Sequence, residues 1–220
     1  ELLGEAATLY VAGHDTQAKT LAWTLWLLEQ HPAILGALME ELDAVLKGRI
    51  PQPEDLPQMP LLDRVIKESM RLITVVPMLF PRISSGDTTL GGHPLPQGAT
   101  VILSPWITHR DPDLYPSPAR FRPERWENLK PSPYEYLPFG GGHRSCIGAS
   151  FATLAMRILL PMILQRYRLA LCPGARISRR VRGNIFGPRY GIPIRIYQQD
   201  RQYSRCTHLR GDLLELVELG

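Results

Sequence analysis

The first thirty residues carry the pattern that most constrains the fold. Apolar or small side chains recur every three or four positions, at Leu2, Ala6, Leu9 and Gly13 and again at Leu21, Leu25 and Leu28. This is the spacing of one buried face of an α-helix, which we expect to stop at His31-Pro32. Such a helix is about 45 Å long and needs neighbours along its whole length. The chain starts inside this pattern without an initiator methionine, so we expect a fragment whose first helix has further neighbours elsewhere.

The rest of the chain predicts a mainly α fold with small antiparallel β-sheets. Further helices are expected over 33–47, over 61–73 and from Ile147 onward. Short runs rich in β-branched residues predict strands between 75 and 103, over 168–171 and over 192–196.

Three local details accompany these helices. Gly48 should close the second helix, with Glu40 and Glu41 facing outward. Pro161 removes a backbone donor and should kink the last helix. Residues 105–145 are rich in proline and irregular, and an irregular stretch of this length inside a compact domain usually serves a function.

Composition excludes several classes of protein. The hydrophobic share of 44% and the charged share of 21% are those of an ordinary globular protein. Three cysteines in 220 residues do not make a disulfide framework, and the apolar run 21–28 is too short to cross a bilayer. Of the 25 basic residues 21 are arginine, and Arg179, Arg180 and Arg182 cluster. No aromatic interleaving, zinc-finger spacing or basic helix accompanies them, so we expect no nucleic-acid partner.

The densest chemical signal runs from Phe139 to Gly148, Phe-Gly-Gly-Gly-His-Arg-Ser-Cys-Ile-Gly. It places Cys146 at the start of a helix, after a glycine-rich loop and beside Arg144. Helix-terminal N–H groups and a nearby cation both favour a thiolate over a thiol. Such a thiolate is a nucleophile or a metal ligand, and His143 is too near in sequence to serve easily as the base that a nucleophile needs.

This order of residues resembles the heme-binding loop of the cytochrome P-450 monooxygenases, in which the cysteine thiolate is the axial ligand of heme iron. The resemblance implies that Cys146 binds the iron and that Gly140 and Gly148 let the backbone approach the macrocycle. It implies that Phe139 packs against the thiolate and that Arg144 pairs with a heme propionate. An axial thiolate pushes electron density toward the iron and favours O–O cleavage.

The segment Ala12-Gly13-His14-Asp15-Thr16 resembles the distal-helix motif of the same family. The resemblance implies that Ala12 and Gly13 loosen one helical turn so that oxygen fits over the iron. Thr16 would hydrogen-bond that oxygen and Asp15 would relay protons. The alternative is that Gly13 is a packing glycine and Thr16 an ordinary helical residue.

Glu68 and Arg71 are three positions apart and share one helical face, where they can pair. They look like the Glu-x-x-Arg pair of the family, and the segment 121–126 is similar to the one whose arginine, here Arg125, closes a structural triad under the heme. The alternative is a set of solvated surface ions. Arg82 matches a second propionate partner, and His109 is expected to be structural rather than a ligand.

Two smaller expectations concern the remaining cysteines and the tryptophans. Cys172 and Cys206 have no partner pattern and are expected to be idle thiols. The stripe around Trp23 and Trp26 should belong to the core.

The resemblance covers about residues 1–197 and corresponds to the C-terminal, heme-binding half of a cytochrome P-450 fold, with 198–220 as an unassigned tail. It implies heme b, O₂ as co-substrate, an apolar small-molecule substrate, and electrons from a separate ferredoxin or flavoprotein. No dinucleotide-binding loop is present, so NAD(P)H would act only through that partner. Arginines around Cys146 could dock an acidic donor. An N-terminal half should complete the protein, and similarity to soluble bacterial members suggests the cytoplasm.

Three alternatives stay open. The chain could be a non-catalytic remnant or one part of a split heme-binding protein. It could be a heme-thiolate enzyme that uses peroxide or rearranges its substrate, although Asp15 and Thr16 speak against this because peroxide users need less proton relay. The third alternative is a basic, nucleic-acid-binding module, which the absence of accompanying motifs already argues against.

Overall fold

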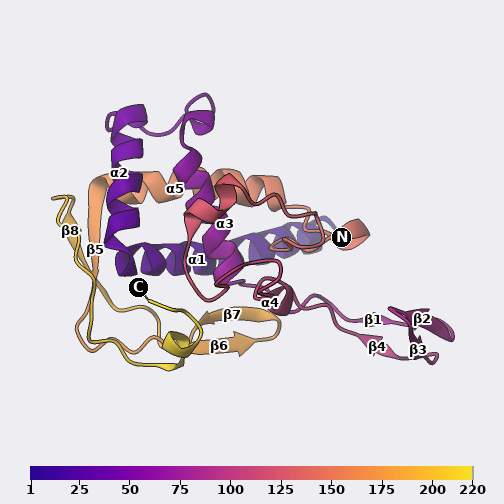
Figure 1. Cartoon of the computed structure of the whole chain (residues 1–220). Helices are drawn as coiled ribbons and strands as arrows, with labels where there is room; N and C mark the ends of the chain where they lie inside the picture. Colours follow the sequence, from indigo (N-terminus) through magenta and orange to yellow (C-terminus); the bar gives the residue numbers. More distant parts are fainter. Residues whose placement is uncertain (220) are drawn as a thin grey trace.

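Helix α1 (Leu2–Gln30) is the central element of the computed structural model, which describes residues 1–219 (Figure 1). Helices α2 (Pro32–Leu46), α3 (Pro60–Leu72) and α5 (Ala149–Arg166) pack against it. The core begins in its C-terminal part, where Trp23, Trp26 and Leu27 are at most 1% exposed. Burying each such side chain contributes about 1.5–3 kcal/mol. The predicted long helix, its end before Pro32 and the core position of both tryptophans are confirmed.

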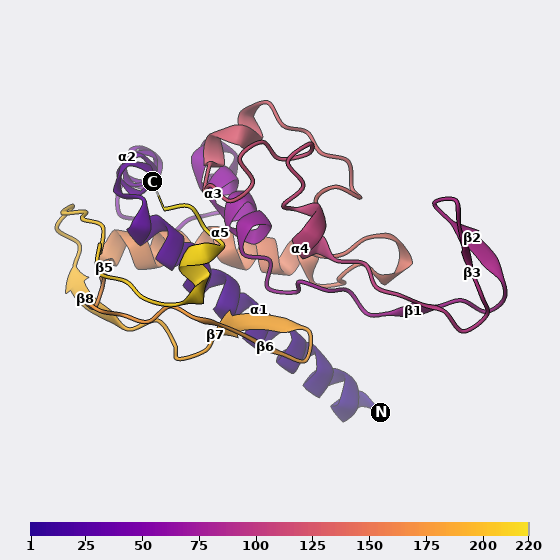
Figure 2. The ribbon, with the colours of Figure 1, turned by 60° about the horizontal axis from the view of Figure 1, so that its bottom comes forward.

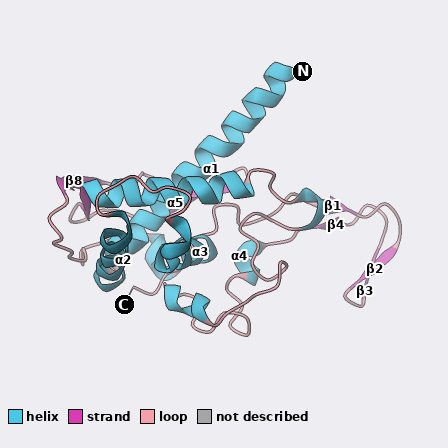
Figure 3. Cartoon of the chain, turned by 90° about the horizontal axis from the view of Figure 1, so that it is seen from above, coloured by secondary structure: helices cyan, strands magenta, loops and turns pink. Residues whose placement is uncertain are grey.

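The N-terminal half of α1 has a different environment. Residues 1–12 are all exposed, including Leu9 at 61% and Val11 at 66%. Figure 3 shows this half of the helix extending away from the body of the molecule. Within residues 1–219, therefore, the apolar face of α1 is covered only toward its C-terminal end.

The junction of α2 and α3 corrects one expectation about surface charge. Glu40 is exposed as predicted, but the prediction that Glu41 faces outward is wrong. The Glu41 carboxylate accepts the backbone N–H groups of Leu61 at 2.8 Å and Leu62 at 2.9 Å. N–H groups in the first turn of a helix have no partner inside the helix, and an acidic group there also meets the positive end of the helix dipole. Glu41 thus caps α3 from a neighbouring helix.

The left-handed residue at the end of α2 is Lys47, with φ 51°, and Gly48 follows with φ 82°. The break after α2 therefore begins one residue before the predicted glycine. Helix α5 begins at Ala149, two residues after the predicted start. It continues through the buried Pro161 as one helix, so that proline does not end it.

The strands form four separate two-stranded antiparallel sheets. The pairs are β1 (Arg82–Ile83) with β4 (Thr100–Val101), β2 (Thr88–Leu90) with β3 (His93–Leu95), β5 (Tyr167–Leu171) with β8 (Ile194–Gln198), and β6 (Arg179–Arg182) with β7 (Ile185–Pro188). The predicted strands are present, and the first two pairs make an arm that projects from the body (Figure 2). The β6–β7 hairpin was not predicted, because its sequence stood out only as an arginine cluster.

The remaining segments connect these elements and close the core. They contain a short helix α4 (Pro105–Thr108) and the 3₁₀ turns η1 (Leu56–Gln58), η2 (Pro123–Glu127), η3 (Gly142–Arg144) and η4 (Asp212–Glu215). The last of these turns belongs to a tail that packs on the core, where Leu213 and Val217 are buried. Over residues 1–219, no helix has the length and apolar character needed to cross a membrane.

Candidate functional site

Glu68 lies at the centre of a buried polar network. Arg71 binds its carboxylate with two parallel hydrogen bonds of 2.9 Å, and both side chains are fully buried. Arg125 Nε and Trp126 Nε1 each donate to the same carboxylate at 2.9 Å, and the Arg122 backbone N–H donates at 3.0 Å. Five hydrogen bonds offset the cost of removing this carboxylate from water. The structure therefore brings Glu68, Arg71 and Arg125 together in one site.

Arg71 extends this network into the irregular region. Its Nη1 donates to the carbonyl oxygens of His109 at 2.7 Å and Pro118 at 2.9 Å, and its Nη2 donates to that of Arg120 at 3.2 Å. Burial is the main reason that the pKa of the nearby Arg125 is lowered, and the Glu68 carboxylate opposes this shift. One guanidinium thus ties helix α3 to the segment 109–120, which has little regular structure of its own.

His109 connects the end of α3 to the start of the cysteine loop. Its Nε2 accepts the backbone N–H of Leu137 at 2.8 Å, and its Nδ1 lies 2.9 Å from Thr74 Oγ1. A backbone N–H only donates, so Nε2 carries no proton and Nδ1–H donates to Thr74. Burial, with help from Arg71 and Arg110, lowers the pKa of His109 to about 3, which keeps the ring neutral. This geometry fits the structural role expected for His109.

The cysteine loop presents its thiol at the surface. The Cys146 backbone N–H donates to the Phe139 carbonyl at 2.8 Å, which closes the loop across the intervening glycines. Gly140 has φ 70°, a region that side chains rarely adopt, so glycine is needed for this turn. Cys146 is an exposed free thiol that precedes α5, and Gly148 occupies the N-cap of that helix. A Cβ on Gly148 would lie 3.8 Å from the sulfur.

The surroundings of Cys146 combine apolar and cationic groups. Ile147 is 93% exposed and Phe151 is 68% exposed. Arg144 is exposed, and among residues 1–219 its guanidinium has no ion-pair or hydrogen-bond partner. Arg82 donates only to the Phe80 carbonyl, at 3.2 Å. The residues next to the thiol therefore offer apolar surface and one unpaired cation, Arg144, whereas Arg82 lies on strand β1 of the arm.

The turn from Ala12 to Thr16 is a regular part of α1. The Thr16 hydroxyl donates to the Ala12 carbonyl at 2.7 Å, a bond that threonines inside helices often make. A Cβ on Gly13 would meet no described atom within 4 Å, so no packing contact inside the chain explains this glycine. The Asp15 carboxylate forms an ion pair with Lys19, one turn further along. No hydrogen bond or ion pair of residues 1–219 joins this turn or Arg82 to Cys146.

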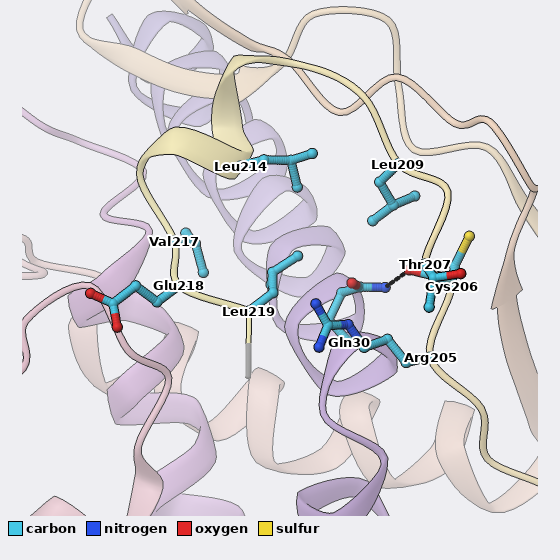
Figure 4. A pocket seen from close by; sticks show the side chains of 9 residues that line it. All are labelled: Gln30, Arg205, Cys206, Thr207, Leu209, Leu214, Val217, Glu218 and Leu219. Atoms are coloured by element: carbon cyan, nitrogen blue, oxygen red, sulfur yellow. Dashed lines mark hydrogen bonds between the residues drawn. The ribbon is translucent and has the colours of Figure 1, made fainter.

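Two of the cavities in the described part of the chain lie next to the cysteine loop and next to the tail. One of about 360 Å³ lies between Phe139 and the first turns of α5, next to the cysteine loop. A larger one of about 430 Å³ lies between the tail and the end of α1, lined by Gln30, Arg205 and Leu214 among others (Figure 4). The Gln30 amide in this larger cavity already donates to the Cys206 carbonyl and so serves to hold the tail. The smaller cavity is the one next to the loop that carries Cys146, the predicted iron ligand.

Two residues that contact the predicted site, Trp126 and Lys19, were not predicted from the sequence. Trp126 adds a fourth side chain to the Glu68 network, and the only signal for it was its position next to Arg125. Lys19 could have been found from its spacing of four from Asp15. Cys172 and Cys206 are free and partly buried.

Comparison with known proteins identifies the family. The family model described as Cytochrome P450 matches residues 1–189. The chain is 39% identical over 197 residues to cyclooctatin synthase of Streptomyces melanosporofaciens, covering 88% of this chain and 43% of that protein. It is 35% identical over 207 residues to the mitochondrial sterol 26-hydroxylase of Rattus norvegicus, covering 90% of this chain and 39% of that protein.

A solved structure agrees with these relatives. A zebra fish cytochrome P450 studied with abiraterone superimposes with a TM-score of 0.77 at 32% identity, covering 89% of this chain and 46% of that one. The chain thus spans less than half the length of each of these proteins. Because the family model covers most of its residues, the chain belongs to the cytochrome P450 family.

Proposed function

We propose that this chain is the heme-binding part of a cytochrome P450 monooxygenase, with the Cys146 thiolate as the iron ligand. The observation that carries the proposal is the loop from Phe139 to Cys146, which is closed by a backbone hydrogen bond and leaves the sulfur exposed. An exposed thiol at the end of a glycine-rich loop suits metal ligation better than core packing.

The residues around Cys146 fit heme b by their chemistry. A heme has a flat apolar surface and two carboxylates, so its site needs a ligand, apolar contacts and cations. Cys146 supplies the ligand, Phe139 and Ile147 the apolar contacts, and Arg144 and Arg82 the cations. Gly148 keeps a side chain away from the sulfur, and Gly140 provides the left-handed turn of the loop.

Bound heme with a thiolate ligand supplies the activation of O₂ and the insertion of one oxygen atom into a substrate. The side chains of this chain then have separate tasks. Cys146 holds the ligand position, and Phe139 limits the access of water to its sulfur. Asp15 and Thr16 hold and move protons on the α1 side of the site, and Ala12 and Gly13 keep that turn free of bulk. Glu68, Arg71 and Arg125 fix the segment that carries the loop.

The partners of the whole protein follow from the same proposal. Electrons would come one at a time from a ferredoxin or flavoprotein, with NAD(P)H acting through that donor, and the substrate would be an apolar small molecule. A relative whose name gives a sterol as its substrate supports the apolar class. Relatives are named as mitochondrial or chloroplastic, so the cytoplasmic location stays a prediction. Residues 1–197 would form the C-terminal part of one domain, completed by an N-terminal half.

Heme reconstitution tests the ligand. The 220-residue chain is mixed with hemin, reduced and exposed to CO, and we expect the red-shifted Soret band of a thiolate-ligated heme. Cys146→Ser should abolish that band, whereas Cys172→Ser, at one of the two partly buried thiols, should retain it. Circular dichroism of each variant checks folding. Failure to take up heme, or a band unchanged in Cys146→Ser, would overturn the proposal.

A heme-binding fragment without activity of its own is the second candidate. The exposure of residues 1–12 favours it, because within residues 1–219 nothing covers the N-terminal turns of α1 that precede Asp15. Turnover is measured with a ferredoxin, its reductase and NAD(P)H. Heme binding without turnover supports the fragment, and full turnover by the 220 residues alone refutes it.

A further inference from the structure

We propose that Lys19 is a positioning residue for Asp15 and that Gly187 is required because it leaves room for the Lys19 side chain. The inference rests on the proposed role of Asp15 in moving protons. It adds two residues, one on α1 and one on the β6–β7 hairpin, that no motif of the sequence indicated.

The first observation is the arrangement along one face of α1. Asp15, Lys19 and Trp23 follow each other at intervals of four and so lie one above the other. Lys19 Nζ forms an ion pair with Asp15 Oδ2. Of the four lysines in the chain, Lys47, Lys67 and Lys130 are exposed, whereas the Lys19 side chain is only 25% exposed. An ordinary surface pair leaves its lysine free to move, so a further contact must restrain this one.

The second observation is how strand β7 is fixed against this face. The Phe186 ring packs against Trp23 at 5.9 Å and stacks on Trp106 at 5.3 Å between centroids. The Phe186 backbone N–H donates to the Val75 carbonyl at 2.7 Å. Phe186 is therefore held by both its side chain and its backbone. This places the next residue, Gly187, directly beside the Lys19 side chain.

The third observation is the close approach of Lys19 to Gly187. A Cβ built on Gly187 would lie 2.5 Å from Cε and 2.9 Å from Cδ of Lys19, which is too close for any real side chain. Gly187 is not among the residues with positive φ, so its backbone does not require glycine. What the observed position of the Lys19 side chain requires is the absence of a side chain at position 187.

Together these contacts hold the Lys19 side chain in one position. Its aliphatic stem lies along the buried backbone of β7, and its ammonium group reaches back to Asp15. The carboxylate is thereby held at one side of the turn that carries Thr16. Alanine at position 187 would displace a flexible side chain rather than backbone, so the hairpin should stay folded while the ion pair is lost.

The geometry is tested without heme by measuring how fast each lysine is acetylated. In the 220-residue chain we expect Lys19 to react more slowly than the exposed Lys47, which serves as the internal reference. Gly187→Ala and Asp15→Asn should each raise the Lys19 rate about two- to fivefold relative to Lys47, the range of a partly exposed ion pair. Gly36→Ala is the matched control, because its added methyl meets only Tyr203 at 4.0 Å. An unchanged Lys19 rate in Gly187→Ala overturns the proposal.

The consequence for Asp15 is tested in the heme-loaded, full-length protein as the ratio of product formed to O₂ consumed. Lys19→Ala and Gly187→Ala should each lower this ratio, whereas a structural defect would lower the amount of heme-loaded protein instead. If Gly187 acts through Lys19, adding Gly187→Ala to Lys19→Ala causes no further loss. Additive losses would show that Gly187 acts independently and would overturn the coupling. Failure of heme binding would remove the proposed function but leave the acetylation result readable.

Discussion

The network around Glu68 finds all its contacts within the described chain. The N-terminal half of α1 (residues 2–13, the free half) does not. Glu68 receives five hydrogen bonds from within the chain, and its neighbour Arg71 is fully buried. In the free half, apolar side chains such as Leu9 stay exposed. A buried charge without partners costs several kcal/mol, so its whole set of contacts must be present where it folds. An exposed apolar side chain costs less free energy than an unpaired buried charge, so the free half can stay uncovered until another surface packs against it.

Removing the charge at the centre of the network should have the largest effect. Glu68→Gln replaces one acceptor oxygen by a donor that faces Arg71, Arg125 or Trp126, and breaking a buried pair in this way costs about 3–5 kcal/mol. Urea unfolding of the 220-residue chain measures the loss. Glu124→Gln removes an exposed partner of Arg122 and should cost about 0–1 kcal/mol. Equal losses in the two variants would mean that the network is not the stabilising feature of this region.

Truncation of one leucine in each half of α1 sharpens the contrast within a single helix. Leu27→Ala empties a fully buried position and should cost about 2–5 kcal/mol. Leu9→Ala changes an exposed position and should alter the free energy of unfolding by no more than about 0.5 kcal/mol. The same denaturant titrations measure both. A large loss at Leu9 would reveal a partner that covers the free half in solution.

We expect the smallest of these effects when the free energy of unfolding is compared over one pH unit. The unfolded state protonates His109 near pH 6.5, whereas the native state does so only near its pKa of about 3. The contribution of His109 is therefore complete above pH 6.5 and is lost as the pH falls toward 3, by at most about 1.4 kcal/mol per unit. Unfolding free energies at pH 7, 6 and 5 measure the slope.

The matched variants separate this slope from that of other groups. His109→Gln should flatten it, because no ring remains to be protonated. His31, whose pKa is also lowered by burial, adds a component of the same sign in both proteins. His93→Gln, on the exposed arm, should leave the slope as it is. A slope that does not change in His109→Gln would contradict a neutral His109 ring with a hydrogen bond at each nitrogen.

Contacts within one helix or loop could be predicted from residue spacing. Among the contacts of Glu68 with distant segments, the one with Arg125 was expected, and only through the resemblance to a family. The pairing of Glu68 with Arg71 follows from their spacing of three. That Trp126 joins them depends on a fold that brings residues 58 positions apart into contact. Glu41 illustrates the same limit, since its helix alone predicts an exposed side chain but the neighbouring helix supplies two N–H groups.

The sequence by itself determined the long first helix, its end before Pro32 and the loop that presents Cys146, because helical spacing, proline and glycine act on the backbone locally. Only the tertiary structure decided which half of α1 is covered, how His109 holds Leu137, and that Lys19 passes over Gly187. These contacts join segments that are remote along the chain, and they depend on how whole elements pack. Residue spacing carries no information about that packing until the elements are placed in space.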